Sequence, residues 1–152
     1  MTERDHHYWM NRAIELAKLC PVVEGAFSVG AVIVGDDGEE ISTGYSRETD
    51  PKVHAEESAL DKLDADDPRL GTATIYSTLE PCSERATKIR RPCTDRILQA
   101  GIPTVVIAWR EPSTFVEDCV GVEKLQQEGV TVIELPELAD AAMAMNRHLN
   151  LS

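Results

Sequence analysis

The sequence has no apolar run near the roughly 20 residues that a membrane-spanning helix needs, so we expect no membrane association. It has no internal repeat, low-complexity tract or linker-like segment, and we expect residues 1–152 to form a single domain. The N-terminal residues MTERDHHYWM are charged and lack the apolar core of a signal peptide. The expected location is therefore the cytoplasm.

The sequence also lacks a surplus of basic residues. It has 15 Lys and Arg against 27 Asp and Glu, which gives a net charge of −12. Because polynucleotide binding depends largely on cationic side chains that meet phosphates, we expect no polynucleotide partner. A small molecule is the better candidate, and a local basic patch could still bind one phosphate.

Cysteines are few, at positions 20, 82, 93 and 119. Disulfides are rare inside cells, so metal binding, catalysis and simple burial are the alternatives for them. Cys20 ends an apolar-periodic segment and Cys119 stands alone in EDCVG, which indicates small buried hydrophobes. Cys82 and Cys93 differ, because both follow a proline and they enclose ten mostly polar residues.

Hydrophobic periodicity predicts the element order α-β-β-α-β-α-β-α-β-α. The segment 28–46 is a predicted β-hairpin with the turn DDG, and the continuous β-branched run PTVVIAW is typical of a strand buried on both faces. Strands that alternate with helices favour parallel pairing, which predicts an α/β/α sandwich around one mixed sheet. The expected helices cover residues 6–20, 54–68, 93–101, 120–129 and 137–149, and the later strands cover 73–81, 103–109 and 130–135.

His54, Cys82 and Cys93 are a candidate metal site. One imidazole and two thiolates suffice for a catalytic zinc, because three protein ligands leave the fourth position to water. Zinc makes hydroxide accessible near neutral pH, and Glu56, close to His54, could accept the proton of that water. A structural zinc remains the alternative, and it would need a fourth protein ligand.

The motif H-A-E, followed by P-C and a downstream cysteine, resembles the zinc-dependent cytidine deaminase superfamily, whose signature is His-x-Glu with Pro-Cys-x-x-Cys. The longer interval between the cysteines, the opening T-L-E-P-C-S and the segments 44–56 and 94–132 are similar to the riboflavin-pathway aminopyrimidine deaminases, in particular the fungal form. The likeness covers roughly residues 26–134.

This resemblance implies a cytidine deaminase-like fold, namely a three-layer α/β/α sandwich with a mixed five-stranded sheet. It implies His54, Cys82 and Cys93 as ligands of Zn²⁺ and Glu56 as the proton shuttle. It also implies a homodimer or a higher homo-oligomer. The sequence departs from the bacterial enzymes after P-C-S, where ERATKIRRP replaces a stretch that is usually rich in histidine.

Several residues are candidates for contact with the substrate, each with a structural alternative. The basic residues between the two cysteines could grip a phosphate or ribityl tail, or could form an ordinary solvated loop. Phe27 could stack on a ring or pack in the core, Glu80 could fix its loop or contact substrate, and Trp109 could wall the pocket or pack. The candidate substrate-binding residues are Phe27, Ser46, Arg47, Ala55, Glu80, Glu84 and Arg85, and the further basic residues are Lys88, Arg90 and Arg91.

The sequence therefore predicts a zinc-dependent hydrolytic deaminase of an aminopyrimidine, favouring a riboflavin-pathway pyrimidine with a ribosylamino or ribitylamino group, with or without phosphate. A deaminase of cytosine-type, cytidine-type or specialised-metabolite pyrimidines is the alternative. A non-catalytic zinc-binding module is a third hypothesis, from another functional class.

Overall fold

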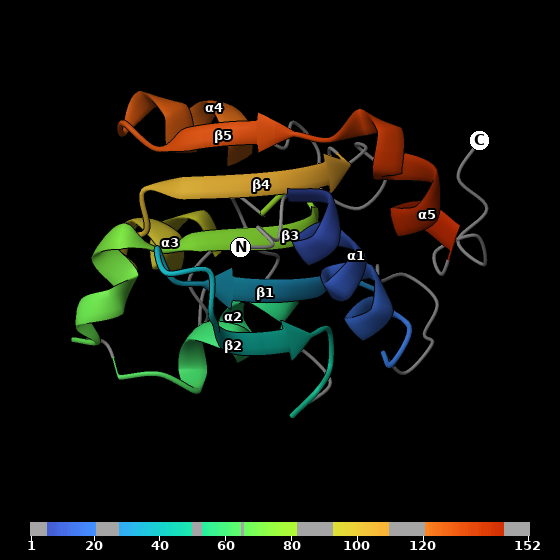
Figure 1. Ribbon diagram of the computed structural model, residues 1–152, viewed down its shortest axis with the longest axis horizontal. Helices are drawn as coiled ribbons and strands as arrows, with labels where there is room; N and C mark the ends of the chain where they lie inside the picture. The colour runs from blue at the N-terminus through green and yellow to red at the C-terminus, as the bar shows by residue number, and fades with distance from the viewer. Residues whose placement is uncertain are drawn as a thin grey trace.

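The computed structural model describes residues 6–20, 28–49, 53–64, 66–81, 93–109 and 121–144. Within these residues the strands form one mixed five-stranded sheet with the order β2-β1-β3-β4-β5 (Figure 1). Helices α1 and α5 cover one face of the sheet, and α2, α3 and α4 cover the other. The predicted element order and the three-layer α/β/α architecture are confirmed.

The elements have the following bounds. The strands are β1 (Gly30–Val34), β2 (Glu40–Tyr45), β3 (Thr74–Leu79), β4 (Thr104–Trp109) and β5 (Thr131–Glu134). The α-helices are α1 (His6–Ala17), α2 (Ala55–Asp61), α3 (Cys93–Ala100), α4 (Gly121–Gln127) and α5 (Ala139–Met143), and two 3₁₀ helices are η1 (Pro68–Thr72) and η2 (Pro136–Leu138).

The sheet combines one hairpin with parallel crossovers. β1 pairs antiparallel with both β2 and β3, whereas β3, β4 and β5 run parallel. The predicted hairpin is confirmed, and its turn contains Gly38 at φ 81°, a backbone region that favours glycine. Because β3 and β4 are parallel, both strands end at the same edge of the sheet.

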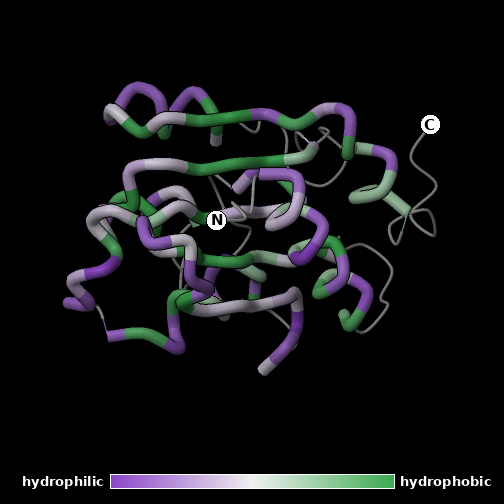
Figure 2. Tube along the Cα trace, in the orientation of Figure 1, coloured by the Kyte–Doolittle hydropathy of each residue, from purple (hydrophilic) through white to green (hydrophobic). Residues whose placement is uncertain are grey.

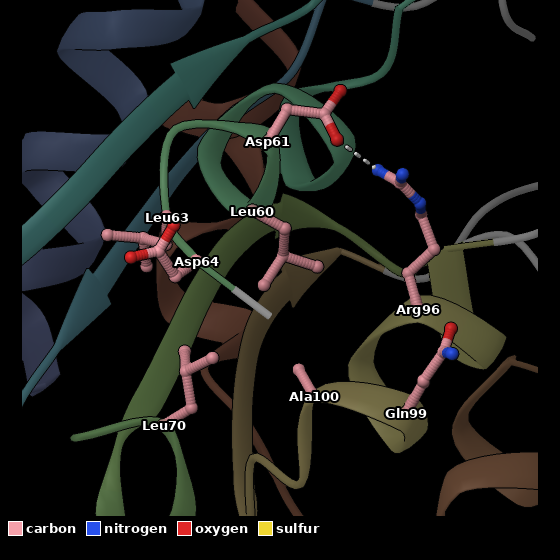
Figure 3. Close-up of a pocket in the computed structure, with 8 residues that line it drawn as sticks. All are labelled: Leu60, Asp61, Leu63, Asp64, Leu70, Arg96, Gln99 and Ala100. Atoms are coloured by element: carbon pink, nitrogen blue, oxygen red, sulfur yellow. Dashed lines mark hydrogen bonds and ion pairs between the residues drawn. The ribbon is translucent and has the colours of Figure 1, made fainter. Parts of the chain in front are cut away.

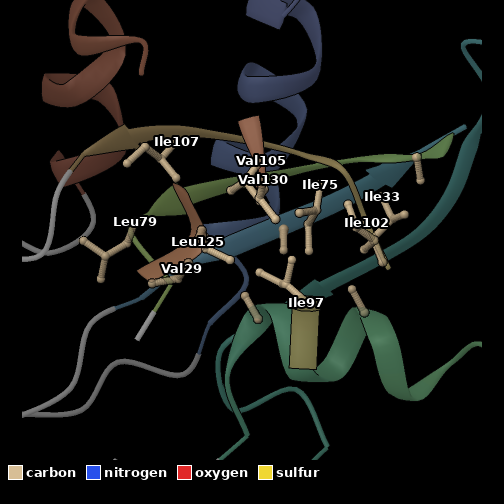
Figure 4. Close-up of a cluster of buried hydrophobic side chains, with 14 of the residues drawn as sticks. Val29, Ile33, Ile75, Leu79, Ile97, Ile102, Val105, Ile107, Leu125 and Val130 are labelled. Carbon is tan, nitrogen blue, oxygen red and sulfur yellow. The ribbon is translucent and has the colours of Figure 1, made fainter. Parts of the chain in front are cut away.

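Two cores flank the sheet, because alternate side chains of each strand point to opposite faces. Ile33 and Ile75 belong to the cluster that faces α2, α3 and α4 (Figure 4). Val32 and Val106 belong to the cluster that faces α1 and α5. The hydropathy colouring shows apolar strands in the middle of the molecule and polar stretches along the helices (Figure 2). Among the described residues, no helix combines the length and the apolar character needed to cross a bilayer.

The helix α2 is shorter than the sequence predicts. We expect a helix over 54–68, but α2 ends at Asp61 and a separate 3₁₀ helix begins at Pro68. The Asp67 side chain accepts a hydrogen bond from the amide of Arg69 at 3.0 Å. This cap starts the 3₁₀ helix η1 at the point where the sequence predicts the end of the longer helix. The predicted boundary at Asp67-Pro68 is thus the beginning of η1.

The position of α2 on the sheet depends on Gly44 in β2. A Cβ at Gly44 would overlap the carbonyl oxygen of Ala55 and lie 2.6 Å from the amide nitrogen of Ala59. We expect Gly44→Ala to lower the free energy of unfolding by about 1–3 kcal/mol, because backbone atoms must move. Urea denaturation measures this, with Gly71→Ala as the control, since no atom lies within 4 Å of a Cβ there. Equal stability of the two variants would contradict this packing role.

Candidate functional site

His54 immediately precedes α2, and its backbone is fixed by two hydrogen bonds. Its carbonyl accepts the amide of Ser58 at 2.9 Å, and its own amide donates to Glu57 Oε1 at 3.1 Å. Glu57 is buried and stands three residues after His54, the spacing of a capping box. This role of Glu57 was not among the expected functions, although its spacing from His54 alone could have indicated it.

Cys93 is the first residue of α3 and is fully buried. Its Sγ lies 3.4 Å from Nδ1 of His54. In a tetrahedral zinc site, with a Zn–S distance of about 2.3 Å and a Zn–N distance of about 2.1 Å, a sulfur and a nitrogen ligand lie about 3.6 Å apart. The separation of these two donor atoms therefore fits two ligands of one zinc ion.

Arg96 joins the two helices that carry these donors. Its Nη1 donates to Asp61 Oδ1 at 2.9 Å and to the carbonyl oxygen of Glu57 at 3.4 Å. The guanidinium of α3 thus binds both a side chain and the backbone of α2. The sequence carries no local signal for this contact, because Arg96 and Asp61 are 35 residues apart.

Glu56, the predicted proton shuttle, lies in the first turn of α2 and is 4% exposed. Its carboxylate is therefore held out of bulk solvent, two residues from His54. Within the part of the chain that the structure describes, no group of three or more His, Cys, Asp or Glu is arranged to hold a metal. The predicted third ligand, Cys82, lies outside the described residues. So do Phe27, Glu84, Arg85, Lys88, Arg90, Arg91 and Cys119.

Ser46 and Arg47 lie in the segment that connects β2 to His54. Ser46 is 4% exposed, and its Oγ accepts the amide of Val29 at 3.0 Å. Arg47 has φ 62°, an uncommon conformation for a residue other than glycine. Its amide donates to the Val53 carbonyl at 2.8 Å, and its Nη2 donates to Ser28 Oγ at 3.1 Å. The hydrogen bonds of both residues therefore hold the segment that leads into α2. Partial burial lowers the pKa of the Arg47 guanidinium.

Ala55, Glu80 and Trp109 have packing contacts in the structure. Ala55 is fully buried beside β2, and Trp109 packs at the edge of the core that faces α2, α3 and α4. Glu80 is 3% exposed, and its Oε2 accepts the amide of Val122 at 2.8 Å. For Glu80 the structure thus contains a bond that fixes its loop, and for Trp109 it contains a packing contact; both were alternatives to substrate contact in the sequence.

Cys20 has the surroundings expected of a structural cysteine. It is 6% exposed, and its Sγ donates to the carbonyl of Val29 at 3.5 Å. Burial raises the pKa of the Cys20 thiol from its ordinary value, which keeps it in the unreactive thiol form.

A pocket of about 240 Å³ lies between α2, η1 and α3, at the ends of α2 and α3 away from His54 and Cys93 (Figure 3). Apolar side chains of α2 and η1 form much of its wall, and the Arg96–Asp61 pair lies at its border. None of the predicted site residues lines it. The lining residues are Leu60, Asp61, Leu63, Asp64, Leu70, Arg96, Gln99 and Ala100.

The three-layer fold, with an imidazole and a thiol meeting at the starts of α2 and α3, defines a cytidine deaminase-like protein. Residues 3–109 match the model of the family described as the cytidine and deoxycytidylate deaminase zinc-binding region, and the chain belongs to this family. The match confirms the predicted superfamily and the predicted cofactor, Zn²⁺. The donor set of His54 and Cys93 fits that metal by its chemistry and its spacing.

Several relatives, among them one from Escherichia coli, are named riboflavin biosynthesis protein RibD. A Schizosaccharomyces pombe diaminohydroxyphosphoribosylamino-pyrimidine deaminase is 44% identical over 136 residues, which cover 88% of this chain and 33% of that protein. The protein of the same name from Buchnera aphidicola is 34% identical over 131 residues, covering 82% of this chain and 80% of the relative. The solved structure of Acinetobacter baumannii RibD is similar with a TM-score of 0.76 and 34% identity, covering 93% of this chain and 38% of that one. This chain therefore spans only a third of the length of some relatives and most of the length of another.

Proposed function

We propose that this protein is a zinc-dependent hydrolytic deaminase that acts on a riboflavin-pathway aminopyrimidine. The observation that carries the proposal is the 3.4 Å approach of Cys93 Sγ to His54 Nδ1, with the buried residue Glu56 two positions after His54 in the chain. The names of the relatives from fission yeast and Buchnera support a phosphoribosylamino-pyrimidine as the substrate.

In this proposal His54, Cys82 and Cys93 hold zinc, which supplies a hydroxide nucleophile near neutral pH when it is bound. Glu56 takes the proton of the attacking water and delivers it to the ring nitrogen next to the amine-bearing carbon. The attack forms the C–O bond. Glu56 then takes the remaining proton of the added hydroxyl and delivers it to the exocyclic amine, so that the C–N bond breaks, ammonia leaves and a ring carbonyl remains. The net reaction consumes one water and needs no other reactant.

The burial of Glu56 suits this role. Because Glu56 is 4% exposed, bulk water has little access to its side chain, as the proposed transfer of protons within a closed site requires. Its place in the first turn of α2 puts it two residues after the proposed ligand His54, which immediately precedes that helix.

We also propose that residues 1–152 act as one deaminase domain, as a homodimer or higher homo-oligomer, in the cytoplasm. The Buchnera relative supports a unit of this size, because this chain covers 80% of it. The net charge of −12 supports a small-molecule substrate in preference to a polynucleotide.

A screen for ammonia release tests the proposed substrate. We expect the purified, zinc-loaded protein to release ammonia from a ribosylamino-pyrimidine phosphate, and to lose this activity when a chelator removes zinc. Cytosine, cytidine and their nucleotides serve as comparison substrates. Preference for a cytidine-type substrate would redirect the proposal to the alternative suggested by the family description, and no release from any aminopyrimidine would overturn it.

A further inference from the structure

The last residues before Cys82 are bound to the end of the sheet. Glu80 directly follows β3, and its amide donates to the carbonyl of Trp109, the last residue of β4, at 2.8 Å. Pro81 follows, is buried, and has no amide hydrogen of its own. The hydrogen bond to β4 therefore fixes the backbone position of Glu80 at the end of the sheet.

The start of α4 binds the side chain of the same residue. Oε2 of Glu80 accepts the amide of Val122 at 2.8 Å, and Glu80 is only 3% exposed. The first amides of a helix have no partner within the helix, and a negative charge there is favourable. Burial of a carboxylate without hydrogen bonds costs free energy, so the hydrogen bond from Val122 stabilises Glu80 in its buried position.

Gly121 brings the backbone of α4 directly onto the turn before Cys82. A Cβ at Gly121 would overlap the carbonyl oxygen of Pro81 and lie 3.2 Å from Cγ of Glu80. Only glycine permits this approach. The end of β4, the start of α4 and the turn Glu80–Pro81 thus form one packed junction, which we call the cysteine junction.

We infer that Glu80 is a positioning residue for the metal centre. By holding the cysteine junction together, it fixes the backbone position of the residue before Cys82 and thereby raises the affinity for zinc. The inference rests on the proposed role of Cys82 as a ligand. Residues that orient metal ligands typically change metal affinity by about 10–100-fold when they are replaced. The burial of Glu80 and its bond to Val122 favour this role over contact with the substrate.

Competition with a chromogenic chelator measures the zinc affinity of the full chain. We expect Glu80→Ala to weaken zinc binding by about 10–100-fold, and Glu80→Gln to weaken it less, because the amide oxygen can still accept the Val122 amide. Asp67→Ala is the matched control. Asp67 also accepts a backbone amide at the start of a helix, that of Arg69 at 3.0 Å, but outside the cysteine junction. Its replacement should leave zinc affinity unchanged.

A second pair of variants tests the same junction without touching a carboxylate. Gly121→Ala should weaken zinc binding, as Glu80→Ala does. Gly71→Ala should leave zinc binding unchanged, because there is open space where its Cβ would lie. If Glu80→Ala fails to fold, Glu80→Gln and the glycine pair still measure the contribution of the junction.

A double-mutant cycle with Cys82→Ala separates positioning from general stability. We expect Glu80→Ala to have little further effect on zinc affinity once Cys82 is absent, because there is no ligand left to position. If Cys82→Ala leaves zinc affinity unchanged, the proposed metal site itself is wrong. If Cys82 matters but Glu80→Ala has no effect, or has the same effect in both backgrounds, the positioning role is overturned and the metal site stands.

Discussion

Replacement of Glu56 with glutamine is expected to lower kcat for ammonia release by about 10²–10⁴-fold, the usual contribution of general acid–base catalysis. Glutamine has nearly the same shape but cannot carry a proton between water and the substrate. Because Glu56 is not a predicted ligand, the zinc content should remain stoichiometric. Steady-state kinetics and metal analysis of the same preparation test both halves of this prediction.

Glu48→Gln is a suitable control for the loss of one carboxylate next to α2. Glu48 Oε1 accepts a hydrogen bond from the Ser58 hydroxyl at 2.6 Å. Its Oε2 forms an ion pair with Lys62 at 2.9 Å. We expect this variant to retain kcat and to lose little stability. Unchanged kcat in Glu56→Gln would contradict the proton-shuttle role, and loss of zinc in that variant would instead assign Glu56 to the metal site.

Local sequence patterns predicted the element order, because they record forces that act within a few residues. The β-branched run of β4 reflects burial on both faces, and the stops at Gly101 and Gly129 have φ of 80° and 87°. The structure places Sγ of Cys93 3.4 Å from Nδ1 of His54, and these are two of the three residues in the predicted metal site. The residue types indicated a catalytic zinc site, and the resemblance to known deaminases added the deamination reaction and the class of substrate.

Contacts between distant segments could not be predicted in this way. The bond from Val122 to Glu80 joins residues 42 positions apart, and neither position has a local pattern that specifies the other. The close approach of Gly44 to α2 likewise depends on how a helix packs on a strand. The early end of α2 was missed for a different reason, because the aspartates before Pro68 are compatible with both a helix and a turn.

Removal of a predicted ligand is expected to have the largest effect on metal binding. Cys93→Ala should weaken zinc affinity by more than about 100-fold, the upper range for residues that only support a ligand. The reason is that Sγ of Cys93 lies at ligand spacing from His54 Nδ1, and alanine offers no donor in its place. His54→Ala should have an effect in the same direction, and chelator competition measures both.

Cys20→Ala is the matched control for this change, because Cys20 is also buried and its thiol donates to the carbonyl of Val29, outside the predicted metal site. Both cysteine variants remove one buried sulfur, so both should lower the free energy of unfolding of the apo protein to a similar degree. Zinc should then raise the melting temperature of wild type and Cys20→Ala, since a ligand that binds the native state stabilises it, and should fail to raise that of Cys93→Ala. An equal response to zinc in the two variants would remove Cys93 from the metal site, whereas the expected difference would separate its role as a ligand from its role in packing.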